Sequence, residues 1–215
     1  MFSIALFTSM EWWAVVCFLI TVVVSYFLGN ISPAILIGRM KGIDIKKEGS
    51  GNAGTTNVLR VLGKQAAAAT LIIDILKGVV AVLLGRAVGL YFLAPQYGIL
   101  LVMACGLAAF LGHIWPLAFG FKGGKGVATG IGILLAVKPM LGVMVSVIAL
   151  LVVVFTKRVS AGSVVGAILC PVMAGFLYPE YFWWSLAMAI VVIIKHRENI
   201  RRLLKGEEPK FSLKK

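Results

Sequence analysis

Long apolar runs separated by polar or glycine-rich segments make up most of this chain. A helix needs about 20 residues to cross roughly 30 Å of hydrocarbon, so runs of this length predict membrane-spanning helices. The runs lie at about 12–40, 65–92, 97–119, 126–156, 160–177 and 181–195. Pro33 removes a backbone donor inside the first run and predicts a kink there. We therefore expect an all-α integral membrane protein with a single domain over residues 1–215.

The run at 126–156 decides how many times the chain crosses the membrane. As one helix it would be about 46 Å long at 1.5 Å per residue, which is too long for one crossing without strong tilt. The residue before a proline disfavours the helical conformation, so Lys138-Pro139 is a natural break. We expect two helices here, and the first of them is short.

The distribution of charge supports this topology. With two helices at 126–156, all of the 21 Lys and Arg residues except Lys77, Arg86 and Lys138 belong to segments on one side of the membrane. With one helix, everything from Lys157 onward would move to the other side. Because basic residues gather in cytoplasmic segments, the sequence predicts seven transmembrane segments with a short fourth segment, an outside N-terminus and a cytoplasmic C-terminus.

Composition agrees with a membrane protein. Hydrophobic residues make up 60% of the chain and charged residues 13%, whereas soluble domains carry about a quarter charged residues. A net charge of +13 fits loops that face anionic lipid, so the bilayer is an expected partner and nucleic acid is not. The three cysteines lie in apolar runs without paired spacing, which predicts free thiols. Residues 1–20 lack a basic n-region, so we expect no cleaved signal peptide.

Two glycine-rich loops carry the candidate chemistry. The first covers 49–60 and reads GSGNAGTTNVLR; the second covers 120–130, reads GFKGGKGVATG, and holds five glycines and two lysines. Glycine lets successive backbone N–H groups turn inward and form an anion-binding nest. One such loop is commonly a flexible basic turn. Two of them on the same predicted cytoplasmic side indicate a phosphate site at the membrane surface.

Two nucleotide-binding motifs are excluded by their surroundings. Residues 49–54 match G-x-G-x-x-G, but this fingerprint requires a preceding strand and a βαβ unit, whereas here a charged segment precedes it and a membrane helix follows. Gly124-Lys125 suggests a P-loop. However, Phe119 stands where that motif needs its first glycine, and Gly126 stands where a Ser or Thr would bind magnesium.

The first loop supplies several groups that bind phosphate oxygens. Hydroxyls and amides satisfy single oxygens, while a guanidinium can hold two at once. These groups belong to Ser50, Asn52, Thr55, Thr56, Asn57 and Arg60. A helix cap would account for one of the Thr or Asn residues, but not for all of them.

Further ionisable residues lie in or beside the apolar runs. Asp74 and Lys77 are one helical turn apart, where charges in a membrane are usually paired. We expect Asp74 to be structural, and leave open whether Lys77 is structural or binds substrate. His113 is either a base or a helix-end donor. His196 and Asn199 are also one turn apart, a pairing that anchoring to lipid does not explain.

Taken together, these motifs resemble the PlsY family of bacterial acyl-phosphate:glycerol-3-phosphate acyltransferases. The matching segments are 49–60, 74–78, 112–129 and 196–208, in order over nearly the whole chain. The resemblance implies a multi-pass protein of the bacterial cytoplasmic (inner) membrane whose active site faces the cytoplasm. It would make 1-acyl-glycerol 3-phosphate (lysophosphatidate) from glycerol 3-phosphate and acyl phosphate, rather than from an acyl thioester. An association with the enzyme that produces acyl phosphate is a further expectation.

The resemblance also implies roles for individual residues. The expected catalytic residues are Ser50, Asn52, Arg60, Lys125, His196 and Asn199. The expected phosphate ligands are Ser50, Gly51, Thr55, Asn57, Arg60, Lys77, Gly123, Gly124 and Lys125. Neither a cofactor nor a metal ion is expected.

The sequence leaves open which group accepts the proton of the attacking glycerol hydroxyl. The His-x-x-x-x-Asp dyad of other glycerolipid acyltransferases is absent after both His113 and His196. Ser50 could act as an acylated nucleophile. Alternatively, the phosphate oxygens of the donor could accept the proton of the attacking glycerol hydroxyl, and we prefer this substrate-assisted route.

Two other classes of protein share some of these sequence features. A transporter for a phosphorylated solute also uses broken helices with glycine turns. The polar residues here gather on one side rather than at mid-membrane, however, and no inverted repeat is evident. A scaffold that anchors to anionic lipid would explain the basic C-terminal segment but not the polar loops.

Overall fold

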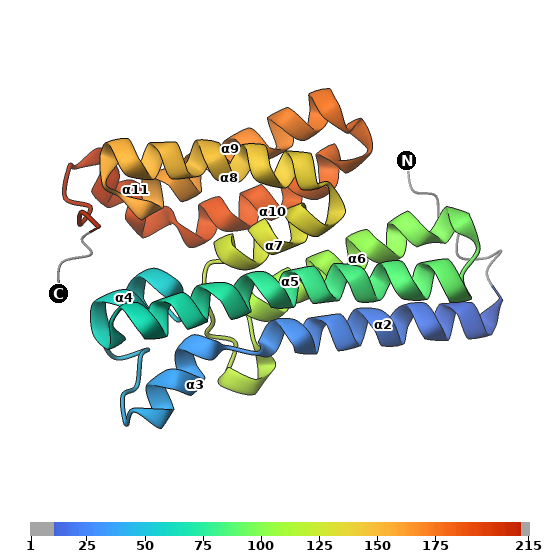
Figure 1. Cartoon of the computed structure of the whole chain (residues 1–215), viewed down its shortest axis with the longest axis horizontal. Coiled ribbons are helices and arrows are strands. Elements are labelled where there is room, and N and C mark those ends of the chain that lie inside the picture. Colours follow the sequence, from blue (N-terminus) through green and yellow to red (C-terminus); the bar gives the residue numbers. More distant parts are fainter. Residues whose placement is uncertain (1–10, 212–215) are drawn as a thin grey trace.

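The computed structural model describes residues 11–211, whose regular structure consists of helices (Figure 1). No strand occurs in this range, so the expected all-α fold is confirmed for it. Residues 1–10 and 212–215 lie outside the described range, and the former belong to the segment where we expect no cleaved signal peptide.

The longer helices are α2 (Trp12–Asn30), α5 (Lys64–Phe92), α6 (Pro95–Ile114), α8 (Pro139–Thr156), α9 (Val159–Leu177) and α10 (Phe182–Lys195). The shorter helices are α3 (Pro33–Met40), α4 (Thr55–Leu62), α7 (Val127–Val137) and α11 (Arg197–Leu204). Two turns of 3-10 helix, η1 (Leu117–Phe119) and η2 (Pro179–Tyr181), complete the described elements.

Prolines divide the apolar runs where the sequence predicted. The first run forms two helices, because α2 ends at Asn30 and α3 begins at Pro33. The run at 126–156 also forms two helices, with α7 ending at Val137 and α8 beginning at Pro139. A proline at the first helical position loses no intrahelical hydrogen bond, and its fixed φ suits a helix start. The break at Lys138-Pro139 is therefore confirmed.

Five stretches of the described chain are long and apolar enough to cross a membrane: α2, α5, the segment Pro95–Phe119, α8 and α9. The two other predicted segments correspond to shorter helices. With 11 residues, α7 is about 16 Å long, roughly half the thickness of the hydrocarbon. With 14 residues, α10 is about 21 Å long. The structure thus confirms that the fourth segment is short.

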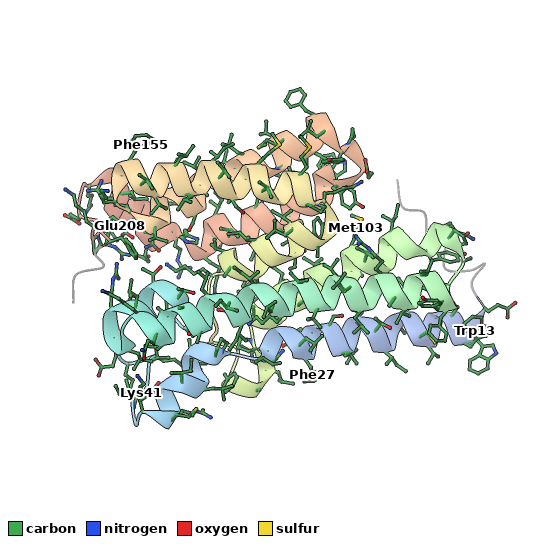
Figure 2. The ribbon with its side chains drawn as sticks, viewed as in Figure 1. Trp13, Phe27, Lys41, Met103, Phe155 and Glu208 are labelled. Carbon is green, nitrogen blue, oxygen red and sulfur yellow. The ribbon has the colours of Figure 1, made fainter. Side chains whose placement is uncertain are left out.

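The helices form two groups joined by α7. One group contains α2, α5 and α6, and the other contains α8, α9 and α10 (Figure 1). Between them, α7 packs on α5 and on α8. Large apolar side chains such as Trp13, Phe27 and Phe155 point away from the bundle (Figure 2). The outer surface is therefore suited to lipid, and the buried core lies between helices.

Polar segments gather at one end of this bundle. Figure 1 shows α3, α4 and α11 at the same end, opposite the first described turn of α2 and the turn between α5 and α6. The chain alternates in direction through α2, α5, α6, α7, α8, α9 and α10. Segments that are more than a hundred residues apart in sequence are thereby brought together at this end.

Glycines allow the helices to approach closely. Apolar side chains gain little by leaving lipid for a helix interface, so helix association depends on backbones that can pack together. A Cβ on Gly132 of α7 would lie 2.1 Å from the carbonyl oxygen of Ile75 in α5, and one on Gly78 of α5 would lie 2.5 Å from that of Thr129 in α7. These two glycines set the distance between α5 and α7.

We predict that Gly132→Ala destabilises the protein by about 1–3 kcal/mol, because its methyl group would overpack the α5–α7 interface. The midpoint of denaturation in lipid nanodiscs measures this loss. Gly98→Ala in α6 is the matched control, since a Cβ at Gly98 has no neighbouring atom within 4 Å. Equal midpoints for the two variants would contradict the prediction.

Candidate functional site

Asn57 holds the first glycine loop in shape. Its buried side chain accepts a hydrogen bond from the Ser50 N–H at 2.8 Å, and its amide nitrogen donates to the carbonyls of Glu48 at 2.9 Å and Ile45 at 3.2 Å. Gly49 has a φ of +60°, and a Cβ there would lie 2.3 Å from Oδ1 of Asn57. The amide hydrogens of Asn57 are thus engaged by the loop, while its expected contact with phosphate stays a prediction.

The remaining polar groups of this loop lie before and along the short helix α4, with Arg60 in its last turn. Ser50 and Arg60 are exposed, whereas Asn52 is half-buried beside Gly54, the residue that precedes the helix. Thr55 places a buried hydroxyl in the first turn, with no hydrogen-bond partner among the described residues. The loop therefore presents hydroxyl and amide groups around one helix N-terminus, where an anion is favoured, and α4 carries the Arg60 guanidinium in its last turn.

The second glycine loop packs directly on the C-terminal end of α6. The N–H groups of Gly123 and Gly124 each donate at 3.2 Å, the first to the Ile114 carbonyl and the second to the His113 carbonyl. The last carbonyls of a helix lack partners within it, and the loop supplies them. These two N–H groups therefore do not form the open anion nest that the glycine spacing suggested. Lys125 is left as the cationic group that follows them.

Close contact explains why glycine occupies these positions. A Cβ on Gly123 would lie 2.0 Å from the His113 carbonyl oxygen, and one on Gly124 would lie 2.2 Å from Nε2 of the same histidine. The Cβ of a residue at 124 would also lie 3.2 Å from the Ala53 carbonyl, which belongs to the first loop. The two glycine loops are thus neighbours, as a shared phosphate site requires.

A buried ion pair lies beneath the second loop. Nζ of Lys77 is 2.8 Å from Oδ1 of Asp74 and donates to the Ile31 carbonyl at 2.7 Å. Nδ1 of His113 is 3.3 Å from the same Asp74 oxygen. All three side chains are buried, which supports the expected structural role of Asp74. The Lys77 ammonium thus interacts with Asp74 and with the Ile31 carbonyl at the break between α2 and α3. Its binding of phosphate remains a prediction.

Lys125 reaches across to α11, where Asn199 accepts a hydrogen bond from its ammonium. Burial lowers the pKa of Lys125 to about 8. Glu208 opposes this shift, whereas the positive charges of Arg202 and Arg60 add to it. Arg60 of the first loop therefore lies within electrostatic range of Lys125, and the arrangement concentrates positive charge where a phosphate would be attracted.

Glu208 fixes the side chain of Asn199 through a hydrogen bond. Its Oε1 accepts hydrogen bonds from Asn199 Nδ2 at 2.6 Å and from the Ser160 hydroxyl at 2.7 Å, and its Oε2 accepts one from Arg202 at 2.7 Å. Burial raises the pKa of Glu208, but these hydrogen bonds outweigh it and hold the pKa below its ordinary value. Arg158 also binds the backbone of this segment, at the Glu208 carbonyl. Glu208 is a residue that sequence reasoning placed in a motif without giving it a role.

His196 is buried at the junction of α10 and α11. Its Nδ1 lies 2.8 Å from the Val192 carbonyl, so Nδ1 carries the hydrogen in the neutral ring and Nε2 is an acceptor. Burial lowers the pKa of His196 to about 4, although the bond to Val192 opposes this shift. The ring is therefore neutral at neutral pH and can accept a hydrogen bond from a hydroxyl.

An apolar pocket with a cavity volume of about 70 Å³ begins beside Lys125. Gly126 and Val127 line it immediately after Lys125, and Val192 lines it one turn before His196. The rest of its wall comes from α7, α8, α9 and α10, with Phe110 from α6. The charged cluster and the apolar pocket thus share a boundary. Within residues 11–211, no three His, Cys, Asp or Glu side chains gather as metal ligands.

Comparisons with known proteins agree with this geometry. Residues 19–206 match the family model described as glycerol-3-phosphate acyltransferase. The glycerol-3-phosphate acyltransferases of Clostridioides difficile and Geobacter sulfurreducens are 45% and 44% identical to this chain over 210 and 197 residues. These matches cover 92% and 90% of this chain and 97% of each relative.

Solved structures give the same result. The crystal structure of PlsY, an integral membrane glycerol 3-phosphate acyltransferase, matches in its glycerol 3-phosphate form with a TM-score of 0.82 and 34% identity, over 91% of this chain and 96% of that one. Its lysophosphatidic acid form matches with a TM-score of 0.79.

Fold, site and relatives together define an integral membrane acyltransferase. The chain belongs to the glycerol-3-phosphate acyltransferase family, the family of PlsY, as its motifs indicated.

We predict that Lys125 gives the activity an alkaline limb. Its ammonium attracts phosphate only while protonated, so kcat/KM for glycerol 3-phosphate should fall by about tenfold per pH unit above a pH near 8. Lys125→Arg keeps its charge throughout this range and should lose the limb, whatever its absolute rate. A pH profile of Lys125→Arg with an unchanged alkaline limb would assign the titration to another group.

Proposed function

We propose that this chain transfers an acyl group from acyl phosphate to glycerol 3-phosphate and releases 1-acyl-glycerol 3-phosphate. The observation that carries the proposal is the shared boundary of the cationic cluster and the apolar pocket at Lys125-Gly126. A donor that bears both a phosphate and a hydrocarbon chain fits such a boundary. An acyl phosphate has these two parts directly joined through the reacting carbonyl.

The two glycine loops would hold the phosphate groups. Arg60 and Lys125 supply charge, and Ser50, Asn52 and the first turn of α4 supply neutral donors. Lys125 and Asn199 form one hydrogen-bonded unit, which a bound substrate would join. We assign Asn57 a positioning role, because its amide hydrogens hold the loop that carries Ser50.

The reaction we propose needs no residue as nucleophile. The glycerol hydroxyl oxygen attacks the acyl carbon, and the bond from that carbon to the phosphate oxygen breaks. The hydroxyl proton passes to an oxygen of the departing phosphate, so the protein positions the reactants and neutralises negative charge. Neutral His196 can accept a hydrogen bond from the glycerol part, which agrees with its expected place at that end of the site.

The burial of both histidines supports this route over an acylated Ser50. His113 is buried between Asp74 and Gly124, and Nδ1 of His196 faces the Val192 carbonyl. A serine nucleophile needs a base within hydrogen-bond reach of its hydroxyl. Ser50 is exposed, whereas both rings are buried, and no hydrogen bond joins the Ser50 hydroxyl to either ring among the described residues.

We further propose seven crossings in the bacterial inner membrane, with the N-terminus outside and the site in the cytoplasm. Basic residues concentrate in and beside α3, α4 and α11, which lie at one end of the bundle (Figure 1), whereas Arg86 belongs to the C-terminal part of α5 and Lys138 precedes α8. This is the asymmetry expected of a cytoplasmic face. A cytoplasmic site could receive acyl phosphate directly from the enzyme that produces it.

The donor is tested with purified protein, labelled glycerol 3-phosphate and one of three donors: acyl phosphate, acyl-CoA or acyl carrier protein. We expect lysophosphatidate from acyl phosphate alone. Product from a thioester donor alone would overturn the proposed donor. Absence of product from every donor, in protein that retains its helical spectrum, would favour a transporter of phosphorylated solutes.

The assigned groups are tested by truncation. Ser50→Ala, Arg60→Ala and Lys125→Ala should each lower kcat/KM by about a hundredfold or more, because each removes a contact to charge that develops in the transition state. Lys122→Ala is the matched control, since Lys122 is an exposed lysine of the same loop and has no assigned role. A trapped acyl group on Ser50 that forms and decays as fast as turnover would overturn the substrate-assisted route.

A further inference from the structure

The apolar pocket has a mouth and a floor. At the mouth, Val127 and Ser163 are half-buried, and they lie near the starts of α7 and α9, which adjoin the charged cluster. Ser163, for instance, is one turn beyond Ser160, which binds Glu208. At the other end, four buried residues line the pocket: Leu134, Val145, Cys170 and Ser185.

The pocket extends into the bundle by about two helical turns. On α9 it runs from Gly162 to Cys170, which is about 12 Å at 1.5 Å per residue. On the antiparallel neighbour α10 it runs from Val192 to Ser185, about 10 Å. The two helices thus give the same depth, measured from the end that carries the charged cluster (Figure 1).

Small side chains make room for this pocket, and its hydroxyls do not make it polar. Gly130, Gly166 and Ala167 belong to its wall. The hydroxyls of Ser146, Ser163 and Ser185 donate to carbonyls of their own helices, at Gly142, Val159 and Phe182. Because these groups are satisfied within the wall, the space presents apolar surface to its occupant.

The floor is closed by the core of the second helix group. Residues of that core lie just beyond it, namely Val137, Leu141, Ala174 and Trp184 on the same helices and Tyr181 in η2. All of them are buried and belong to one apolar cluster with the floor residues Leu134, Val145 and Cys170. A chain that enters at Lys125-Gly126 therefore meets packed side chains at the level of Cys170.

The geometry points to a length limit for the acyl chain, set by Leu134, Val145, Cys170 and Ser185 at the pocket floor. The inference rests on the proposed function, since the occupant is the hydrocarbon chain of the donor whose phosphate lies at Lys125. Each methylene of the acyl chain that is buried in the pocket contributes to the binding free energy of the donor. A chain longer than the pocket must fold back or displace the packed side chains of the floor.

The test is a series of saturated acyl phosphates of increasing length, with kcat/KM measured for full-length protein in lipid nanodiscs. For the wild type, kcat/KM should rise with the length of the acyl chain to a maximum and then decline. Val145→Ala removes two methyl groups from the floor, so its maximum should move to donors about one or two methylenes longer. For those donors, kcat/KM should rise by about fourfold per newly accommodated methylene. Cys170→Leu should move the maximum toward shorter donors.

Val147→Ala is the matched control, because Val147 lies on the same helix with its side chain on the exposed outer surface. Its profile should equal that of the wild type. Identical profiles for Val145→Ala, Val147→Ala and the wild type, with transfer occurring, would overturn the length limit and leave the proposed function intact. No transfer from any acyl phosphate by the wild type would instead overturn the proposed function.

A second readout uses the native thiol of Cys170 and does not depend on turnover. The protein is treated with a small apolar thiol reagent and acyl phosphate in the absence of glycerol 3-phosphate, and the modified cysteine is identified by mass spectrometry. Donors long enough to reach the floor should slow modification of Cys170 severalfold, while modification of half-buried Cys17 should not change. Protection that is the same for short and long donors would also overturn the inference.

Discussion

The carboxylate of Asp74 is the constraint on which the arrangement around it depends. A charge inside an apolar bundle is stable only with a partner, and Asp74 has two, Lys77 from its own helix and His113 from α6. Lys77 also holds the Ile31 carbonyl, at the break where α2 gives way to α3. His113 in turn provides the surface on which Gly124 packs. One buried acid therefore fixes three separate segments beneath the glycine loops.

A second carboxylate acts in the same way from the opposite side of the site. Glu208 accepts hydrogen bonds from Asn199, Ser160 and Arg202. Asn199 in turn accepts a hydrogen bond from Lys125 and so fixes the position of its ammonium. Neither acid has to touch a substrate to affect one. Asp74 supports the backbone of the second loop through His113, and Glu208 supports the side chain of the lysine in that loop. A cationic cluster that must attract phosphate is thus held in place by two anions that are already paired within the protein.

Much of this could be predicted from the sequence, and the limits have physical reasons. Apolar run length and Pro33 and Pro139 predicted the helices and their breaks, because those signals act locally. The motifs predicted which loops belong together, and the contact between Ala53 and Gly124 agrees. The sequence suggested an anion nest at Gly123-Gly124, but it cannot tell which carbonyl an N–H will meet. The burial of Glu208 could not be predicted from the sequence either, because its neighbours along the chain do not distinguish it from exposed acids of the same segment.

The order of the chain separates Lys125 from the groups that support it. Lys125 lies near the middle of the sequence, but its support through Asn199 comes from Glu208, which follows every predicted membrane segment. A chain that ended after α10 would hold every predicted membrane segment and Lys125, but it would lack both Asn199 and this carboxylate. Completion of the site therefore depends on the segment after α11, which binds α9 through the hydrogen bond from Ser160 to Glu208.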